Sequence, residues 1–164
     1  MKIYIMGSTG AGKTYLSKKL SNKYNIESFE LDKIVYDQNN LMTHRSDKDI
    51  EKDFNKIINK KSWIIEDIGR KRFYKGRLLA DKIYYIKISK SKTYKQMIHR
   101  WYKQLKNKED YYNIKPTIKS LIKQLNDVRL YKKQENKILK ELEPFKDKLI
   151  FIKRGDNLDW KNLQ

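Results

Sequence analysis

The segment Gly7–Thr14 has the residue types and spacing of a phosphate-binding loop. It reads GSTGAGKT and fits the pattern G-x-x-x-x-G-K-[ST]. In such a loop the glycines let backbone N–H groups turn inward around a phosphate, and a following helix directs its positive end at the same anion. Lys13 would reach the β- and γ-phosphates of a nucleotide, and the Thr14 hydroxyl would coordinate Mg²⁺. The residues expected to bind the nucleotide are Gly7, Ser8, Thr9, Gly10, Ala11, Gly12, Lys13 and Thr14.

The loop lies between a short apolar segment and a segment with helical periodicity. Residues 2–6 are expected to form a buried strand, and the spacing of Leu16, Leu20 and Tyr24 predicts a helix over residues 13–24. A strand, a glycine-rich loop and a helix in this order are the context in which the pattern binds phosphate. The context favours a nucleotide site over a chance glycine turn, with ATP and Mg²⁺ as the expected ligands.

Strands and helices are expected to alternate along the rest of the chain. The expected strands are 26–31, 63–65, 81–89 and 149–152, and the expected helices are 47–59, 93–106 and 116 to about 143, with a closing helical turn over 158–163. This alternation implies parallel strands joined by crossovers, and therefore an α/β fold with helices on both faces of the sheet. Residues 1–164 are expected to form a single domain, because their number suits one core and no linker interrupts them.

The composition is that of a polar but folded protein. Hydrophobic residues make up 38% and aromatic residues 12% of the chain. The absence of cysteine excludes disulfides and thiolate metal sites. No apolar run is long enough to cross a membrane, and the first residues lack the apolar core of a signal peptide. We therefore expect a cytoplasmic protein with no membrane partner.

The formal net charge of +19 has two interpretations. One is a polyanionic partner, such as nucleic acid or a phosphorylated ligand. The other is compositional drift, because the charge comes mostly from lysines spread along the whole chain, which would form a solvated surface. The arginines are few, and their planar, bidentate donors make them the more selective cations. They are Arg45, Arg70, Arg72, Arg77, Arg100, Arg129 and Arg154.

Carboxylates stand where two of the expected strands end. The carboxyl ends of parallel strands face the ligand crevice of an α/β sheet. Asp32 is therefore expected to bind an acceptor hydroxyl or a Mg²⁺-bound water and to act as a base, with a helix cap as the alternative. Either Glu66 or Asp67 is expected to hold the hydration shell of Mg²⁺, because adjacent residues of a strand point to opposite faces. The alternative for each is a solvated turn.

The length of the chain favours a small P-loop kinase over a motor or a large ATPase. Such a kinase needs an acceptor site opposite the nucleotide and a closing segment that excludes water. Several segments, taken in order, resemble the bacterial DNA topology modulation family of P-loop kinases, which are relatives of adenylate and shikimate kinases. The resemblance covers nearly the whole chain and is carried by MKIYIMGSTGAGKT, ELDKIVYD, SWIIED, RLLADKIYYIKIS and KILKELEPFKDKLIFIK.

The resemblance implies a three-layer P-loop kinase fold with a five-stranded parallel sheet in the order 2-3-1-4-5. Helices would flank the sheet, and a small helical lid would occupy roughly residues 93–115. It further implies binding of ATP and Mg²⁺ and transfer of the γ-phosphoryl group to a nucleotide or another small phosphate acceptor. Between the two adjacent carboxylates it favours Glu66, which with Thr14 would be the metal ligand.

The resemblance also gives roles to arginines. Arg45 and Arg77 would bind the phosphate or carboxylate of the acceptor, beside Asp32. Arg100, on the lid, would stabilise charge on the transferred phosphoryl group. Further candidates are Arg129, which would join the site on closure, and Arg154 with Gly155, which would contact adenine. The alternative for each arginine is a place on the surface with no role in the site. The expected catalytic residues are Lys13, Asp32, Arg77 and Arg100.

A second hypothesis is an ATP-binding, nucleic-acid-associated regulatory protein with little or no kinase activity. It rests on the charge and on aromatic residues that alternate with lysines in the expected lid and could stack on bases, namely Trp101, Tyr102, Tyr111 and Tyr112. The sequence has no helix-turn-helix, zinc-finger or RNA-binding signature. The identity of the acceptor and the oligomeric state are left open by the sequence.

Overall fold

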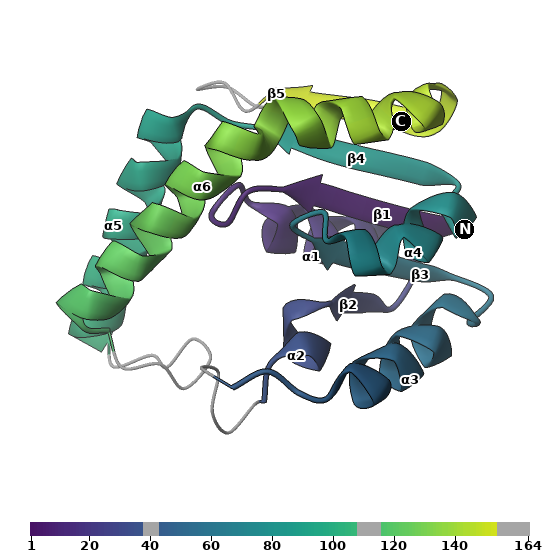
Figure 1. Cartoon of the computed structure of the whole chain (residues 1–164), viewed down its shortest axis with the longest axis horizontal. Helices are drawn as coiled ribbons and strands as arrows, with labels where there is room; N and C mark the ends of the chain where they lie inside the picture. Colours follow the sequence, from purple (N-terminus) through teal and green to yellow (C-terminus); the bar gives the residue numbers. More distant parts are fainter. Residues whose placement is uncertain (38–42, 108–115, 154–164) are drawn as a thin grey trace.

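The centre of the fold is a five-stranded parallel sheet in the order β2-β3-β1-β4-β5 (Figure 1). The computed structural model describes residues 1–37, 43–107 and 116–153. The strands are β1 (Lys2–Gly7), β2 (Ser28–Glu30), β3 (Trp63–Asp67), β4 (Lys82–Lys87) and β5 (Leu149–Lys153). The predicted α/β class and strand order are therefore confirmed. The predicted closing turn over residues 158–163 lies outside the described residues.

Helices cover both faces of this sheet. They are α1 (Lys13–Tyr24), α2 (Asp32–Val35), α3 (Asp47–Ile58), α4 (Tyr74–Leu79), α5 (Lys90–Asn107) and α6 (Ile118–Leu142), with 3₁₀ helices η1 (Lys71–Phe73) and η3 (Glu143–Lys148). The N-terminus of α3 is capped by Ser46, whose hydroxyl accepts the Asp49 N–H. Thr117 and Ser120 form a capping box at the start of α6. Pro144 stands at the start of η3, where α6 has ended. Among the described residues, none of the helices is both long and apolar enough to span a membrane.

Alternate side chains of β1 enter two separate cores. Ile3 and Ile5 pack with Leu16 and Leu20 of α1 on one face of the sheet. Tyr4 and Met6 pack on the other face, where α3, η1 and the end of α6 supply apolar side chains. Residues of a strand alternate between faces, so one buried strand holds both layers of helices in place.

Helices α5 and α6 pack against each other, and α5 with the first part of α6 stands beyond the carboxyl ends of the strands (Figure 1). The indole N–H of Trp101 in α5 donates to the Thr117 carbonyl at the start of α6, at 3.2 Å. On the sheet side, α5 approaches the glycine-rich loop closely. A Cβ added to Gly10 would lie 3.2 Å from Met97 Cγ. The two helices therefore form a wall beside the loop. Helix α5 contains residues 93–107 of the segment predicted as a lid, and residues 108–115 of that segment lie outside the described residues.

Helix α4 was not predicted, and it packs against the sheet through a glycine. A Cβ at Gly76 would lie 2.8 Å from Tyr4 Cε2 and 3.1 Å from Phe54 Cζ.

Gly76→Ala is therefore expected to destabilise the protein by about 1–2 kcal/mol, because overpacking outweighs the gain in helix propensity. Urea unfolding measures the change. Lys75→Ala, at an exposed position of the same helix, should stay within about 0.5 kcal/mol of wild type. A Gly76→Ala variant more stable than wild type would contradict the packing.

Candidate active site

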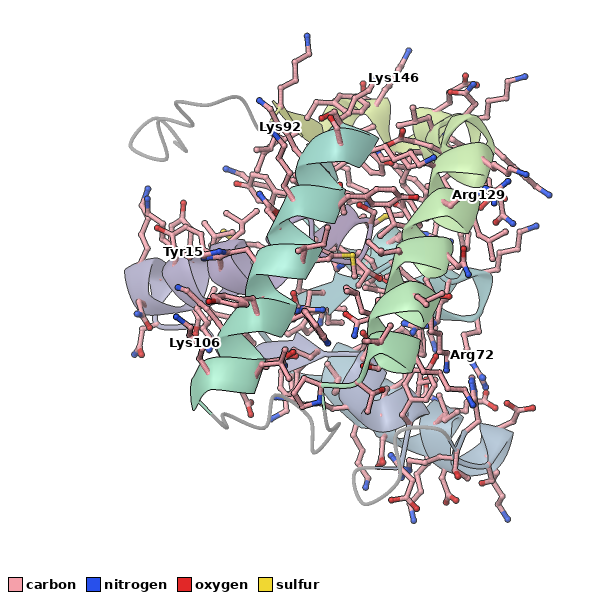
Figure 2. The ribbon with its side chains drawn as sticks, turned by 90° about the vertical axis from the view of Figure 1, so that its left-hand side faces the viewer. Tyr15, Arg72, Lys92, Lys106, Arg129 and Lys146 are labelled. Carbon is pink, nitrogen blue, oxygen red and sulfur yellow. The ribbon has the colours of Figure 1, made fainter. Side chains whose placement is uncertain are left out.

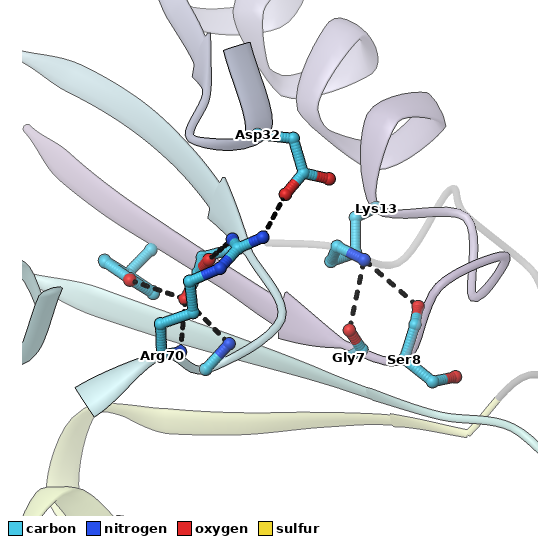
Figure 3. A network of polar contacts seen from close by, with 8 residues as sticks. Gly7, Ser8, Lys13, Asp32 and Arg70 are labelled. Carbon is cyan, nitrogen blue, oxygen red and sulfur yellow. Dashed lines mark hydrogen bonds and ion pairs between the residues drawn. The ribbon is translucent and has the colours of Figure 1, made fainter. Parts of the chain in front are cut away.

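The glycine-rich loop connects β1 to α1 and bends back over the start of the helix. Gly10 and Gly12 have φ angles of 74° and 96°, in the left-handed region that favours glycine. The Lys13 ammonium donates to the Gly7 and Ser8 carbonyls at 3.1 and 3.0 Å (Figure 3). Burial lowers the pKa of Lys13, and the nearby Glu66 carboxylate opposes that shift. The loop thus holds its lysine close to its own backbone, at the N-terminus of α1.

Thr14 and Glu66 meet through a hydrogen bond between the first turn of α1 and the end of β3. The Thr14 hydroxyl donates to Glu66 Oε1 at 2.8 Å, and Oε2 lies 3.1 Å away. The β1–β3 register pairs Ile5 with Glu66. Glu66 projects from the same face as Ile64, which belongs to the α1-side core. A hydroxyl beside a carboxylate is an oxygen pair of the kind Mg²⁺ prefers, so these residues fit the metal that the loop pattern implies.

Burial raises the pKa of Glu66 to about 7, although Lys13 and the Thr14 hydroxyl act in the opposite direction. The ordinary value is 4.5, so the folded protein holds this proton more tightly than the unfolded chain. The stability contributed by the group is complete below the unfolded pKa and is lost as the pH rises through the folded pKa.

Glu66→Gln is therefore expected to flatten the pH dependence of stability in the Mg²⁺-free protein. Between about pH 5 and about pH 8.5 the wild type should lose about 2–3 kcal/mol more than the variant, because a shift of one pKa unit corresponds to about 1.4 kcal/mol. Urea unfolding in the presence of a chelator at both pH values measures this difference. Equal losses in the two proteins would show that Glu66 is not buried as described.

Asp67, the neighbour of Glu66, points to the opposite face and has structural partners. Its carboxylate accepts the backbone N–H groups of Gly69 and Arg70 at 2.7 and 2.6 Å, and the Tyr4 hydroxyl at 3.4 Å. It also accepts from the Arg70 guanidinium. The Asp67 side chain is fully buried. The carboxylate therefore shapes the turn after β3, while Glu66 faces Thr14.

Arg70 was not among the predicted site residues, yet it joins two carboxylates at the carboxyl ends of the strands (Figure 3). One guanidinium nitrogen bonds to Asp67 and the other to Asp32. Burial alone would lower the pKa of Arg70, but the Asp67 and Asp32 carboxylates outweigh it and raise the pKa. Asp32 opens α2, whose cap position is Leu31 and is made without a side-chain hydrogen bond. The Asp32 carboxylate therefore takes part in this arginine bridge and does not cap the helix.

One cavity of about 810 Å³ brings most of the predicted residues together. It extends from the glycine-rich loop, past the ends of β2 and β3, to the facing sides of α5 and α6. The predicted residues in its lining are Thr9, Gly10, Lys13, Thr14, Asp32, Glu66, Asp67 and Arg100. On the helical wall, the Arg100 guanidinium donates to Gln124 Oε1 at 2.6 Å. The arrangement places the glycine-rich loop, the hydrogen-bonded Thr14–Glu66 pair and the exposed Asp32 carboxylate around one space.

Arg45 and Arg77 are not brought to this cavity. The Arg45 guanidinium donates to Asp53 at 2.8 Å and to the Ile34 carbonyl at 3.1 Å, which ties α3 to α2. Arg77 is only 2% exposed and lines a separate depression beside α4. Arg45 precedes a helix and Arg77 precedes a strand, as predicted, but neither side chain lines the larger cavity.

The remaining candidates lie elsewhere. Arg129 is exposed and points away from α5 (Figure 2). Tyr111, Tyr112, Arg154 and Gly155 lie outside the described residues. Residues 1–37, 43–107 and 116–153 contain no cluster of three or more histidines and carboxylates able to hold a metal ion. A metal held by Thr14 and Glu66 would therefore draw its remaining ligands from the nucleotide and water.

Comparison with known proteins places this geometry in a known fold. No protein-family model and no curated protein matches the sequence. Solved structures do match. A gluconokinase from Sinorhizobium meliloti 1021 shares 13% identity over 96% of this chain and 84% of its own, with a TM-score of 0.57. A shikimate kinase from Bacteroides thetaiotaomicron shares 17% identity over 97% and 89%, with a TM-score of 0.56.

A third similar structure is the YorR protein from Bacillus subtilis in complex with phosphorylated GDP. It shares 14% identity over 94% of this chain and 85% of its own, with a TM-score of 0.52. At these identities the likeness concerns the fold. The chain has the five-stranded, three-layer fold of the small P-loop kinases.

Proposed function

We propose that this protein is an ATP-dependent phosphotransferase that moves the γ-phosphoryl group to a hydroxyl of a small acceptor. The observation that carries the proposal is the shared cavity, which Lys13, the Thr14–Glu66 pair and Asp32 all line. The fold likeness to sugar, shikimate and nucleotide-binding proteins agrees with a small acceptor. Membership of the DNA topology modulation family is part of the same proposal and rests on the sequence motifs.

The donor half of the site consists of the loop and the start of α1. Backbone N–H groups of residues 7–14 would surround the β- and γ-phosphates, and Lys13 would exchange its bonds to the loop carbonyls for bonds to phosphate oxygens. Thr14 would ligate Mg²⁺ directly, and Glu66 would hold its water shell. The ion, when bound, neutralises charge on the phosphates.

The acceptor half lies around Asp32. Its side chain is about half exposed, at 51%, so an acceptor hydroxyl can approach it. The carboxylate would accept the hydroxyl proton as the acceptor oxygen forms its bond to phosphorus and the bond to the ADP oxygen breaks. Arg70 would orient Asp32 through their ion pair. Arg100, on the α5 wall of the same cavity, would donate to the transferred phosphoryl group.

A panel of acceptors tests this function directly. Nucleoside monophosphates, nucleosides, sugar acids and small hydroxy acids are each incubated with Mg·ATP, and acceptor-dependent ADP release is measured. We expect at least one class to stimulate release well above the ATPase background. Stimulation by none, with ATP binding shown by calorimetry, would refute the transferase and support an ATP-binding regulatory protein.

We also propose nucleic acid as a second candidate partner, on the strength of α5. This helix carries no acidic residue from Lys90 to Asn107, and its exposed Lys106 lies over the Tyr102 ring, with 4.8 Å between the ammonium and the ring centroid. Specific binding should survive near physiological salt with a steep log–log salt slope. If the affinity for nucleic acid disappears at physiological salt, α5 is a solvated basic surface and not a nucleic-acid site.

A further inference from the structure

Arg77 of α4 is a buried cation for which residues 1–37, 43–107 and 116–153 supply no ion-pair partner. Its side chain is 2% exposed, and within the described part of the chain no hydrogen bond or ion pair reaches its guanidinium. Its Nε atom is buried and has no hydrogen-bond partner among the described residues. The guanidinium carbon lies 5.2 Å from the centroid of the Tyr74 ring, which offsets part of the charge.

A buried guanidinium depends on a neighbouring anion more strongly than a buried lysine or histidine does. Its pKa is too high for the group to lose its proton, so it stays charged when it is buried. An unpaired buried charge costs several kcal/mol, and one cation–π contact offsets only part of that cost. The nearby Asp67 carboxylate is already engaged by Arg70 and by two backbone N–H groups. The described residues therefore do not neutralise the charge of Arg77, and an anion from outside the chain can do so.

The remaining surface of Arg77 lies in the wall of a depression of about 420 Å³. The other lining residues are Lys71, Tyr74, Glu141 and Pro144, and none of them lines the larger cavity. Lys71 stands at the rim and makes a loose ion pair with Glu141, with 3.5 Å between Nζ and Oε1. The lysine side chain is 74% exposed, so it can turn toward a ligand without losing a buried contact.

We propose that this depression binds a phosphate group, with Arg77 in its wall and Lys71 at its rim. The guanidinium presents parallel N–H donors that match two phosphate oxygens, and the ammonium adds a mobile second charge. Tyr74 gives the group an aromatic wall. The ligand is inorganic phosphate or the phosphate of a small phosphomonoester. The site is distinct from the nucleotide loop, so the proposal is independent of the proposed transferase activity.

The site also adjoins the turn that positions Arg70. Arg77 Nη1 lies 4.0 Å from the position that a Cβ on Gly69 would occupy. Gly69 has a φ of 98°, a conformation that glycine adopts readily. A phosphate drawn to Arg77 would therefore lie beneath the segment that carries the Asp32–Arg70–Asp67 bridge.

Equilibrium dialysis with radiolabelled inorganic phosphate tests the site in a Lys13→Ala background, which weakens binding at the nucleotide loop. We expect about one phosphate per chain to remain. Adding Arg77→Lys should weaken it by roughly tenfold or more, because lysine keeps the charge but loses the fork, and Arg77→Met should abolish it. Circular dichroism confirms that each variant is folded, and the lysine variant serves if the methionine variant is not. Phosphate binding that is indifferent to both substitutions overturns the proposal.

Glu141→Gln gives a test of opposite sign. It removes a negative charge from the rim and releases Lys71, so phosphate affinity should rise by roughly threefold to tenfold. If Glu141 itself neutralises Arg77 in solution, the variant would lower the melting temperature without raising phosphate affinity, and the proposal would fail.

Repeating the dialysis with glycerol 3-phosphate as competitor distinguishes free phosphate from a phosphomonoester as the ligand. Stronger competition than by inorganic phosphate assigns a phosphomonoester, equal or weaker competition assigns free phosphate, and no competition by either overturns the site.

Discussion

Lys13→Ala is expected to lower acceptor-dependent turnover by roughly a thousandfold while leaving the fold intact. The side chain removed is the cation that would neutralise charge on the transferred phosphoryl group, and losing one such preorganised donor typically costs a factor of about 10²–10³ or more in kcat. Its ammonium donates to the Gly7 and Ser8 carbonyls of its own loop, so its removal breaks no hydrogen bond with another element of the described structure. The measurement is steady-state ADP release with the best acceptor of the panel.

Lys18→Ala is the matched control for this variant. Lys18 lies on the same helix and is exposed, so its loss changes net charge equally without touching the loop. Its turnover should equal that of the wild type. Full activity in Lys13→Ala, with a normal circular dichroism spectrum, would remove the loop lysine from the mechanism.

Arg70→Ala is expected to reduce both stability and turnover. The substitution withdraws the counter-ion from Asp67, whose side chain is fully buried, and breaking a buried ion pair by removing one partner costs about 3–5 kcal/mol. The two backbone N–H groups that Asp67 keeps should hold the loss nearer to about 2–4 kcal/mol. Asp32 loses its orienting partner at the same time, which should lower kcat by roughly tenfold to a hundredfold. Urea unfolding and acceptor-dependent ADP release measure the two effects.

Arg72→Ala provides the comparison for Arg70→Ala. Arg72 pairs with Asp47 at 2.7 Å, and the Asp47 side chain is 89% exposed. An exposed pair of this kind is worth about 0–1 kcal/mol. Equal destabilisation by the two substitutions would mean that Asp67 does not depend on Arg70.

The donor half of the site could be predicted because it is local in sequence. A strand, a glycine-rich loop and a helix lie within 24 residues, and α1 has the predicted bounds. Alternation along the strand predicts that Glu66 and Asp67 point to opposite faces of the sheet, but it does not say which of them faces α1. Resolving it from residues alone would require knowing which face of the sheet α1 covers, which is a property of the assembled layers.

The acceptor half could not be predicted in the same way. In α4 the usual burial pattern is reversed, because Gly76 and Arg77 are buried while Tyr74 and Leu78 are exposed. Apolar periodicity therefore gave no sign of this helix. Arg70 stands just beyond the end of β3, so the rule that selected Asp32 applies to it too, but the turn that aims its side chain depends on Asp67. Arg45 and Arg77 show that closeness to a strand end along the chain does not set a side chain's direction.

The pairing of Ile5 with Glu66 makes the chemistry of the site depend on the length of a distant turn. Strand β3 is apolar on both faces, since Trp63 and Ile65 enter one core and Ile64 the other. Hydrophobicity alone would barely oppose a slip by one residue, but a slip would exchange the faces of Glu66 and Asp67. The residues between α3 and β3 lie at the opposite end of the strand from the loop, and the length of this connection sets the register of β3 against β1. Their number decides which carboxylate meets Thr14.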